Sequence, residues 1–330
     1  MIQGLYLLDE RAYHLIYGPE VHQQIEALVN IYAPPQTAEM IAQHPALLAE
    51  AQVIFSGWGC PMMSEELLFH ALELKVIFYG AGSIRYLVTP EFWEQGIQIT
   101  SAYRANGIPV SEFALAQITL SLKRYWQHTQ QVKAGGGWWN HLPVAGAYGS
   151  TVGLVSLGMI GRMMVERLKS LEVHVIAYDP FATPEEAERL GIELCSLEEV
   201  FCRADVVSLH TPWLPETVGL VRGAHLASMK EGATLINTSR GAIVREDEMV
   251  EVLQRRPDLY ALLDVTYPEP PEPSSPLRRL PNVIISPHIA GSLDRECLRN
   301  GQYMVDELKR YLSGQPLQYA ITRERAAIMA

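Results

Sequence analysis

The sequence predicts an α/β protein of two domains, each built around a parallel β-sheet. The chain has 330 residues, which exceeds the roughly 100–200 residues of one ordinary domain. Short apolar runs rich in β-branched residues alternate with helical patterns, as βαβ units require. This alternation occurs in two series that a long helical pattern separates. Hydrophobic residues make up 48% and charged residues 19%, a balance typical of ordered globular proteins.

The first series lies before residue 103. Its expected strands are 2–8, 51–57, 74–80 and 97–102, with helical patterns at 19–30 and 90–96 between them. A longer helical pattern follows over 109–135, with apolar residues near the 3.6-residue spacing. Pro109 stands at its expected start, where a proline costs least, and Gly135 stands at its end.

The second series predicts a larger sheet, with strands at 151–158, 172–179, 205–210, 233–239, 259–265 and 283–288. Helical patterns follow most of these strands, as at 161–171 and 245–256. The last pattern, 293–314, predicts one long helix that ends at Gly314. We expect this helix to return to the first domain, because the second series already closes at Pro287. The chain would then cross twice between the domains, with a hinge and a cleft.

Charge and cysteine pattern argue against several classes of protein. The net charge is −11 and the pI about 5.4, so the chain repels the phosphate backbone of nucleic acids. No apolar run approaches the roughly 18–20 residues of a membrane span. The start MIQGLYLL predicts a first strand rather than a signal peptide. We expect no metal knuckle, no disulfide framework and a cytoplasmic location, because CxxC spacing is missing among Cys60, Cys195, Cys202 and Cys297.

Residues 156–161 predict a phosphate-binding turn. They spell Ser-Leu-Gly-Met-Ile-Gly between a strand and a helix, which is the dinucleotide fingerprint GxGxxG with serine at the first glycine. Gly158 would let the backbone approach a pyrophosphate, and Gly161 would let the helix pack on the strand. The helix N-terminus would face the phosphates. Asp179 ends the next strand, where a carboxylate binds a ribose diol and repels a 2′-phosphate, so the pattern predicts NAD. Turn glycines without any ligand are the ordinary alternative.

Titratable side chains follow three later strands. Arg240, Glu269 and His288 come after or at the ends of the strands at 233–239, 259–265 and 283–288. Carboxyl ends of parallel strands share one edge of a sheet, so these side chains could converge. Arginine offers a planar fork for a carboxylate, histidine exchanges protons near neutral pH, and glutamate can orient the imidazole and stabilise its charged form. Singly, each has an ordinary structural role; together with a nicotinamide, they predict hydride transfer on a 2-hydroxy or 2-keto acid.

These segments resemble a known family, the D-isomer-specific 2-hydroxyacid dehydrogenases. The family includes phosphoglycerate, glyoxylate/hydroxypyruvate, D-lactate and formate dehydrogenases. The resemblance covers nearly the whole second series and the end of the first. Its segments are 74–82, 106–116, 152–162, 177–180, 204–221, 229–244, 262–270 and 286–291.

The resemblance implies both a fold and roles for residues. A Rossmann-type doubly wound parallel sheet, residues 103–296, would bind NAD and be inserted into a smaller flavodoxin-like parallel α/β substrate domain, residues 1–102 plus 297–330. Arg240 resembles the substrate-binding arginine, His288 the acid/base and Glu269 its carboxylate partner. Asp264 matches the acid that faces the nicotinamide carboxamide. The implied cofactor-binding positions are Gly158, Met159, Ile160, Gly161, Asp179, Pro180, His210, Thr211, Pro212, Thr217, Thr238, Ser239, Asp264, Ala290 and Gly291.

The substrate side is less specific. Ala81 and Gly82 match a loop whose amides hold the substrate carboxylate, and Asn106 matches an asparagine at the domain junction. Trp58 follows the strand at 51–57 and is either a substrate contact or a packing residue. Two arginines, Arg85 and Arg104, are either surface charges or ligands of a phosphate or second carboxylate.

The chain also departs from the family pattern. Ser156 replaces the first fingerprint glycine, Ser83 stands where the family usually has aspartate, and residues 101–104 replace the usual Asn-x-Pro-Gly. Formate dehydrogenases pair the histidine with a glutamine, so Glu269 argues against that activity.

The predicted function is an NAD-dependent oxidoreductase that interconverts a small D-2-hydroxy acid and its 2-keto acid. We expect no metal, nucleic acid or membrane as a partner. The alternative is an NAD-sensing binding or scaffold protein of the C-terminal-binding corepressor type, which looks like this family and keeps much of the site. The region 103–145, with Trp138 and Trp139, resembles the family's dimerisation region and predicts a homodimer.

Overall fold

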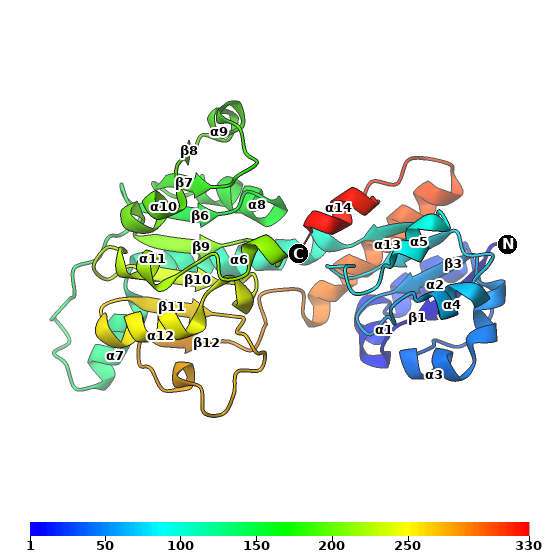
Figure 1. Cartoon of the computed structure of the whole chain (residues 1–330), viewed down its shortest axis with the longest axis horizontal. Helices are drawn as coiled ribbons and strands as arrows, with labels where there is room; N and C mark the ends of the chain where they lie inside the picture. The colour runs from blue at the N-terminus through cyan, green and yellow to red at the C-terminus, as the bar shows by residue number, and fades with distance from the viewer. Residues whose placement is uncertain (330) are drawn as a thin grey trace. The chain divides into compact units, whose positions relative to one another are not determined.

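A computed structural model describes residues 1–329, which divide into two compact units (Figure 1). Unit 1 contains Met1–Gly107 and Ser292–Met329, and unit 2 contains Ile108–Gly291. Each unit is built on one sheet whose strands all pair in parallel. Helices cover both faces of each sheet, so the predicted α/β class with two parallel sheets is confirmed.

The sheet of unit 1 has the flavodoxin-like strand order. Within the described residues it has five strands in the order β2-β1-β3-β4-β5. The strands are β1 (Gln3–Leu7), β2 (Asn30–Ile31), β3 (Val53–Ser56), β4 (Val76–Tyr79) and β5 (Gln98–Ser101). The sequence did not predict β2, because two residues are too few to show a period of two.

Helices cover the unit 1 sheet on both sides because its strand residues alternate between two cores. Phe55 and Phe78 face one core, and Ile54 and Ile77 face the other. The first core is closed by α1 (Glu10–Ile16), α2 (Pro19–Glu26) and α13 (Cys297–Leu312). The second is closed by α3 (Ala38–Gln43), the 3₁₀ turn Pro45–Glu50, α4 (Glu65–His70), α5 (Pro90–Glu94) and α14 (Arg323–Ile328).

The C-terminal segment continues the unit 1 sheet beyond β5. Thr100 and Ala320 form an antiparallel bridge, and Ile321 N donates to Ile99 O at 2.9 Å. The predicted helix over 293–314 is a short 3₁₀ turn, Asp294–Glu296, followed by α13, which ends at Leu312. Gly314 then adopts a φ of 65°, as expected for a glycine that ends a helix.

The sheet of unit 2 has the doubly wound strand order of dinucleotide-binding domains. Within the described residues it has seven strands in the order β12-β11-β10-β9-β6-β7-β8, with the order reversing between β6 and β9. The strands are β6 (Thr151–Val155), β7 (His174–Tyr178), β8 (Glu193–Leu194), β9 (Val206–Leu209), β10 (Thr234–Asn237), β11 (Tyr260–Leu263) and β12 (Val283–Ile285). The short β8, like β2, was not predicted.

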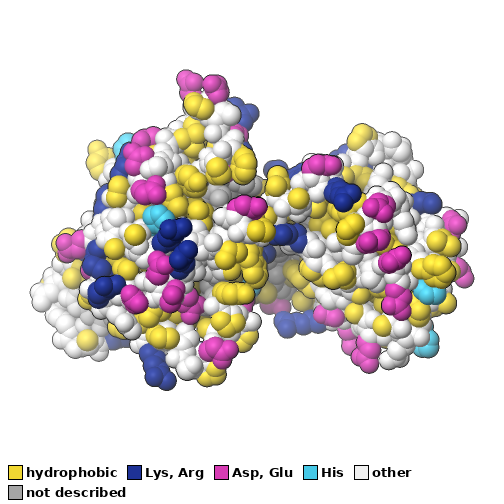
Figure 2. All heavy atoms as spheres, viewed as in Figure 1, with side chains coloured by type: hydrophobic (Ala, Val, Ile, Leu, Met, Phe, Trp, Pro, Cys, Tyr) yellow, Lys and Arg dark blue, Asp and Glu magenta, His cyan; other side chains and the backbone are white. Residues whose placement is uncertain are grey.

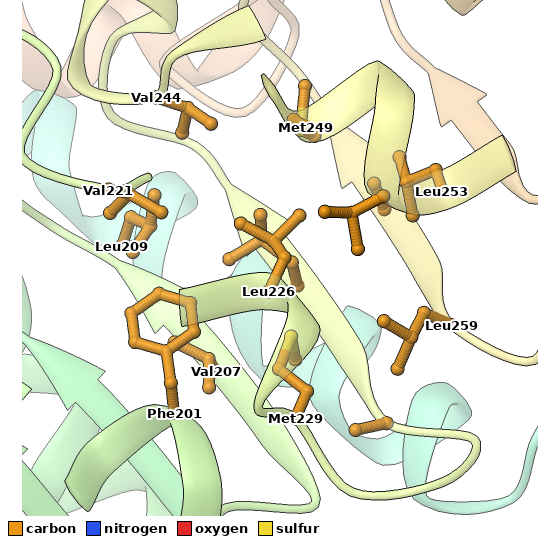
Figure 3. Close-up of a cluster of buried hydrophobic side chains, with 14 of the residues drawn as sticks. Phe201, Val207, Leu209, Val221, Leu226, Met229, Val244, Met249, Leu253 and Leu259 are labelled. Carbon is orange, nitrogen blue, oxygen red and sulfur yellow. The ribbon is translucent and has the colours of Figure 1, made fainter. Parts of the chain in front are cut away.

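Two cores sandwich the unit 2 sheet. On one face pack α10 (Leu197–Arg203), α11 (Gly223–Ala227) and α12 (Glu246–Arg255). Figure 3 shows this cluster, in which Phe201, Leu226 and Leu253 from these three helices pack over one face of the strands. On the other face pack α6 (Tyr103–Leu122) and α8 (Met159–Leu168). The unit also contains α7 (Tyr125–Lys133), α9 (Pro184–Leu190) and 3₁₀ turns at Pro215–Thr217, Gly241–Ile243 and Pro276–Arg278.

The prediction of one helix over 109–135 was wrong at both its start and its middle. Helix α6 begins at Tyr103, whose N–H donates to Ser101 Oγ at 3.1 Å, and Pro109 lies inside it. A proline inside a helix costs about 3 kcal/mol, which the burial of this helix's apolar side chains offsets. At Arg124 the backbone turns left-handed, with a φ of 48°, so α6 ends at Leu122 and α7 starts at Tyr125.

The surface is mixed in charge. On the face drawn in Figure 2, Lys and Arg side chains are interspersed with Asp and Glu rather than gathered into one basic patch. All four cysteines are free. Among the described helices, none combines the length and apolarity that crossing a membrane requires.

Candidate active site

The turn after β6 has the close backbone contacts that its glycines predict. Gly158 lies at the N-cap of α8, and a Cβ built on it would have no atom within 4 Å. A Cβ on Gly161 would lie 2.2 Å from the carbonyl oxygen of Ser156, so this helix packs against the turn too closely for any residue larger than glycine. Gly158 therefore leaves open space above the N-terminus of α8, and Gly161 sets how closely α8 approaches the strand.

Ser156 keeps the backbone conformation of the glycine it replaces. Its φ is 79°, a left-handed value that costs a residue with a side chain roughly 1–2 kcal/mol. Its buried hydroxyl donates to Thr211 Oγ1 at 3.0 Å, which links the turn to the loop after β9. The serine thus preserves the turn and adds a hydrogen bond that a glycine would lack.

Asp179 lies beside the phosphate turn and braces it. One carboxylate oxygen accepts a hydrogen bond from Leu157 N at 2.7 Å. The other accepts from Phe181 N at 2.8 Å and Ala182 N at 3.1 Å, across the turn that contains Pro180. A carboxylate has about four acceptor positions, so one remains for a ribose hydroxyl. The structural role of Asp179 was missed by the sequence, which offers no signal for a side chain that bonds a turn more than twenty residues away.

The loops after β9 and β10 bring unpaired polar atoms to the same edge of the sheet as this turn. Both strands lie on the β6 side of the sheet, so their carboxyl ends lie near the turn. His210 Nε2 contacts Ser208 Oγ at 3.1 Å, while His210 Nδ1 and Thr238 Oγ1 are buried without a partner among residues 1–329. Burial lowers the pKa of His210 to about 4, so its imidazole is neutral at pH 7.

These features fit a dinucleotide. A helix N-terminus above an open glycine accommodates phosphates, and buried polar atoms without partners are the kind that a ligand satisfies. The residues that would hold NAD are those of the turn, Asp179 and the loops after β9 and β10. No group of three or more His, Cys, Asp or Glu in the described part of the chain could hold a metal ion.

Glu269 and His288 form a direct pair. The loop after β11 carries Glu269, the loop after β12 carries His288, and these two strands are neighbours. His288 Nδ1 lies 2.6 Å from Glu269 Oε1, and both side chains are partly exposed, at 48% and 40%. No described residue contacts His288 Nε2 through a hydrogen bond. One nitrogen of the imidazole is therefore held by a carboxylate, and the other is open to a reactant.

Asp264 supports the loop that carries His288. This carboxylate is buried, and its Oδ1 accepts from Ser286 Oγ at 2.6 Å and from Ile289 N at 2.9 Å. Its Oδ2 accepts from Ala290 N at 2.8 Å. The backbone N–H of His288 donates to Asp264 O at 2.9 Å, and His288 has a φ of 53°. Asp264 thus holds a strained backbone on both sides of His288, a function that the sequence did not reveal.

Arg240 lies next to the same pair. It follows β10, and its Nη1 donates to Ser239 O at 2.7 Å. Burial lowers the pKa of Arg240 and the nearby Glu269 carboxylate raises it; an arginine stays charged in either case. The side chain of Asn237 fixes this turn, because its Nδ2 donates to Arg240 O at 2.9 Å and its Oδ1 accepts from Ser239 N at 3.0 Å. The Asn-x-Ser spacing was the available signal for this turn.

A glycine brings the loops of Arg240 and Glu269 into contact. A Cβ on Gly241 would lie 2.0 Å from the carbonyl carbon of Thr266 and 2.5 Å from Tyr267 N. These are backbone atoms, so no larger residue fits without moving the loop that continues to Glu269. The structure therefore brings Arg240, Glu269 and His288 to the same edge of the unit 2 sheet.

Thr217 has a local role in the loop after β9. Its hydroxyl donates to Pro212 O at 2.6 Å and accepts from Leu214 N at 2.8 Å. The side chain therefore closes the 212–217 turn. The sequence placed Thr217 among cofactor-binding positions, and a cofactor role for it remains a prediction.

In unit 1, the predicted substrate-side residues lie at the carboxyl edge of the sheet. Ala81 and Gly82 follow β4, and Trp58 follows the neighbouring β3. A Cβ on Gly82 would lie 3.4 Å from Asn106 Nδ2, so Asn106 adjoins this loop. Asn106 Oδ1 accepts from Ser292 N at 3.1 Å. Trp58 is half-buried and its carbonyl accepts from Asp9 N at 3.0 Å.

Comparison with known proteins relates the sequence to one family. Residues 115–290, just over half of the chain, match the family described as D-isomer specific 2-hydroxyacid dehydrogenase, NAD binding domain. The predicted cofactor, NAD, is confirmed by this match. The D-3-phosphoglycerate dehydrogenase of Archaeoglobus fulgidus is 31% identical over 258 residues, covering 78% of this chain and 49% of that protein. The chain spans about half the length of the curated relatives it matches.

Solved structures agree with the fold. The TT0316 protein from Thermus thermophilus has a TM-score of 0.75 and 28% identity, covering 97% of this chain and all of that one. A phosphoglycerate oxidoreductase from Rhizobium etli has a TM-score of 0.82 over 98% of this chain and 99% of that one, at 21% identity. At that identity the likeness shows the shared fold alone.

Alanine substitutions at the two turn glycines should have different effects on stability and on NADH affinity. Gly158→Ala adds a methyl group to open space, so the free energy of unfolding should change by less than about 0.5 kcal/mol while NADH affinity falls. Gly161→Ala forces a methyl group against the Ser156 carbonyl and should cost about 2–3 kcal/mol of stability. Chemical denaturation and NADH titration of both variants measure the two effects. A Gly158→Ala variant with unchanged NADH affinity would contradict the phosphate role of this turn.

Proposed function

Because the chain belongs to the D-isomer specific 2-hydroxyacid dehydrogenase family, we propose that it interconverts a small D-2-hydroxy acid and its 2-keto acid with NAD. The observation that carries this proposal is the Glu269–His288 pair, whose open imidazole nitrogen belongs to the same unit as the NAD-binding turn. The relatives with matching sequences are named as dehydrogenases, which favours catalysis over the corepressor-type alternative.

His288 is the proposed acid and base. In reduction, its Nε2 donates a proton to the keto oxygen; in oxidation, the neutral imidazole accepts the proton of the hydroxyl. Bound NADH supplies the hydride for the reduction. Glu269 holds Nδ1 at 2.6 Å, which fixes the orientation of the ring and leaves Nε2 facing the reactant. The backbone of His288 is held in place by Asp264.

Arg240 is the proposed anchor of the substrate carboxylate. Its side chain is partly buried, and a charge partly removed from water interacts strongly with an incoming anion. A planar fork binds a carboxylate through two parallel hydrogen bonds, which lysine cannot do. The same positive charge polarises the adjacent keto group and favours hydride addition to it.

Asp179 is the proposed determinant of the choice between NAD and NADP. Its remaining acceptor position suits a ribose hydroxyl, and its negative charge opposes a 2′-phosphate. Because the same carboxylate braces Leu157, its removal would affect the phosphate turn as well as this choice.

The edge of unit 1 favours a substrate whose side group is not anionic. Asp9 occupies the N-cap of α1 but makes no cap hydrogen bond, and none of the described residues pairs with its carboxylate. This carboxylate lies against Gly59, where a Cβ would fall 2.0 Å from Asp9 Cγ. The indole of Trp58 precedes Gly59 in the same loop. A carboxylate in this place repels a phosphate and accepts hydrogen bonds from a hydroxyl or amine.

Tyr86 lies near this carboxylate. Its hydroxyl contacts Tyr79 Oη at 2.6 Å. Burial raises the pKa of Tyr86, the bond with Tyr79 lowers it, and the charge of Asp9 adds to the rise. We propose that the protein prefers hydroxypyruvate, or another 2-keto acid with a neutral side group, over a phosphorylated 2-keto acid. In this it would differ from its relatives named as phosphoglycerate dehydrogenases.

A second copy of the chain is the proposed partner. Helix α7 has no buried residue, and the following segment exposes Trp138 at 71%, Trp139 at 82% and Tyr148 at 83%. Some buried side-chain atoms on α6 and α7 find no hydrogen-bond partner among residues 1–329. They belong to Gln117, Ser121, Trp126, Gln127 and Gln131. A monomer rarely exposes several large aromatics in one segment, and a homodimer through this region would cover them. The cytoplasmic location stays a prediction that the four free cysteines support.

The decisive experiment is NADH oxidation with a panel of 2-keto acids. Glyoxylate, hydroxypyruvate, phenylpyruvate and 3-phosphohydroxypyruvate should be compared by kcat/KM, and the phosphorylated acid should be the poorest of the last three. Asp9→Asn should raise kcat/KM for 3-phosphohydroxypyruvate by about three- to tenfold, because one repelling charge is removed. Glu10→Gln removes the same charge one residue away and should change little. Preference of the wild type for the phosphorylated acid would instead assign Arg85 or Arg104 to a phosphate.

Substitutions of the His288 pair test the chemistry. His288→Asn should lower kcat by at least about 10²-fold at every pH, with NADH affinity retained, because the proton donor is gone. Glu269→Gln keeps the shape but replaces the carboxylate that orients the imidazole through Nδ1, so it should slow keto-acid reduction with NADH affinity retained. The pH profiles of kcat/KM for both variants measure this. Wild-type turnover in His288→Asn would refute the assignment.

The oligomeric state can be tested with a matched pair of substitutions. Trp139→Arg places a charge in the proposed interface and should lower the mass measured by light scattering from that of a dimer towards that of a monomer. Phe69→Arg alters an aromatic of similar exposure, 73%, on α4 of unit 1 and should leave the mass unchanged. A wild-type protein that is monomeric at micromolar concentration would disprove the proposal.

A further inference from the structure

The loop after β4 presents backbone N–H groups without an acceptor among residues 1–329. Gly80 N donates to Ser56 O at 2.7 Å, but no described residue accepts a hydrogen bond from the N–H of Ala81, Gly82 or Ser83. Ala81 is fully buried. Gly82 and Ser83 are only partly buried, so a ligand can reach their N–H groups. A backbone donor that is left unpaired costs about 1–3 kcal/mol unless a ligand or water satisfies it.

The hydroxyl of Ser101 holds the other side of this loop. Ser101 ends β5 and is fully buried. Its Oγ lies 2.9 Å from Ala81 O and 2.5 Å from Gly82 O, and it accepts from Tyr103 N at 3.1 Å. One hydroxyl proton is therefore shared between two consecutive carbonyls, and the oxygen is committed to the start of α6.

This contact fixes which N–H groups face away from Ser101. In a trans peptide the C=O and the following N–H point in opposite directions. Because the carbonyls of Ala81 and Gly82 both point to Ser101, the N–H groups of Gly82 and Ser83 point away from it. Asn106 Nδ2 lies beside Gly82 and adds a third donor to this place. Three neutral donors in one spot suit a carboxylate.

We propose that Ser101 is a positioning residue that orients the Gly82 and Ser83 N–H groups toward the carboxylate of the substrate. The inference rests on the proposed function. The carboxylate role of this loop is what the family resemblance implies, and the role of Ser101 is the new part. It also gives a structural role to one departure from the family pattern. Ser101 stands where the family usually has asparagine, and its single hydroxyl holds the carbonyls of Ala81 and Gly82.

The C-terminal segment keeps Ser101 itself in place. Ser101 N donates to Tyr319 O at 3.2 Å. Tyr319 N in turn donates to Oε2 of Glu307 at 2.9 Å, and this glutamate is fully buried on α13. A continuous path of hydrogen bonds therefore runs from α13 through the C-terminal segment and Ser101 to the loop after β4.

Removal of the hydroxyl tests the proposal. Ser101→Ala frees the two peptide planes, so KM for the preferred keto acid and the dissociation constant of oxamate from the NADH complex should rise together, by about tenfold. The dissociation constant of NADH and, at saturation, kcat should change by less than about twofold. Ser101→Thr keeps the hydroxyl and should recover most of the oxamate affinity.

Ser56→Ala is the matched control. Ser56 is also fully buried at the end of a strand, and its hydroxyl donates to Leu7 O at 2.6 Å, so both alanine variants lose a buried hydrogen bond to a backbone carbonyl. The melting temperature should fall in both, whereas oxamate affinity should fall only in Ser101→Ala. A folded Ser101→Ala variant with wild-type KM and oxamate affinity, or an equal loss in Ser56→Ala, would overturn the inference. A wild type that binds oxamate but reduces no keto acid would overturn the proposed reaction and leave the loop assignment standing.

Discussion

Parallel pairing of β9, β10, β11 and β12 is the constraint on which the proposed active site depends. In a parallel sheet every strand ends at the same edge, so the loops that follow these strands are neighbours although they are far apart in sequence. The loops carry His210, Arg240, Glu269 and His288 in turn. These residues therefore lie along one edge of the sheet, and strands of only three or four residues suffice to set the spacing between their loops.

Buried polar side chains then fix the conformation of the loops along this edge. Asp264 is buried and uses both oxygens on the His288 loop, and Asn237 uses its whole amide on the Arg240 turn. Unpaired, such groups would each cost a few kcal/mol, so the loops are held where the bonds are satisfied. His210 Nδ1 and Thr238 Oγ1 differ, because they lack a partner among residues 1–329 and lie at the same edge of the sheet as the phosphate turn. The structure thus separates polar groups that hold loops from polar groups available to a ligand.

The two units use the same principle for different ends. In unit 1 a buried serine and a buried glutamate hold the loop after β4, whose backbone donors stay unused. In unit 2 a buried aspartate holds a histidine with one open nitrogen. In both, the side chain that determines the geometry is buried and satisfied, while the group proposed to act remains free. Asp9 is the exception, because none of the described residues pairs with its carboxylate, and its proposed role is in substrate choice rather than in loop geometry.

Much of this protein was determined by the sequence alone. Alternation of apolar runs and helices predicted both parallel sheets, the turn at 156–161 predicted the dinucleotide site, and the spaced segments predicted the family. These signals are local, because each depends on residues within one strand, turn or helix. What the sequence could not supply depends on contacts between distant segments. The start of α6 at Tyr103 rests on Ser101, not on Pro109, and the left-handed Ser156 is held by Thr211 from another loop. Only the folded chain brings such partners within hydrogen-bond distance, and so the tertiary structure decided which polar residues hold the loops and which remain free to act.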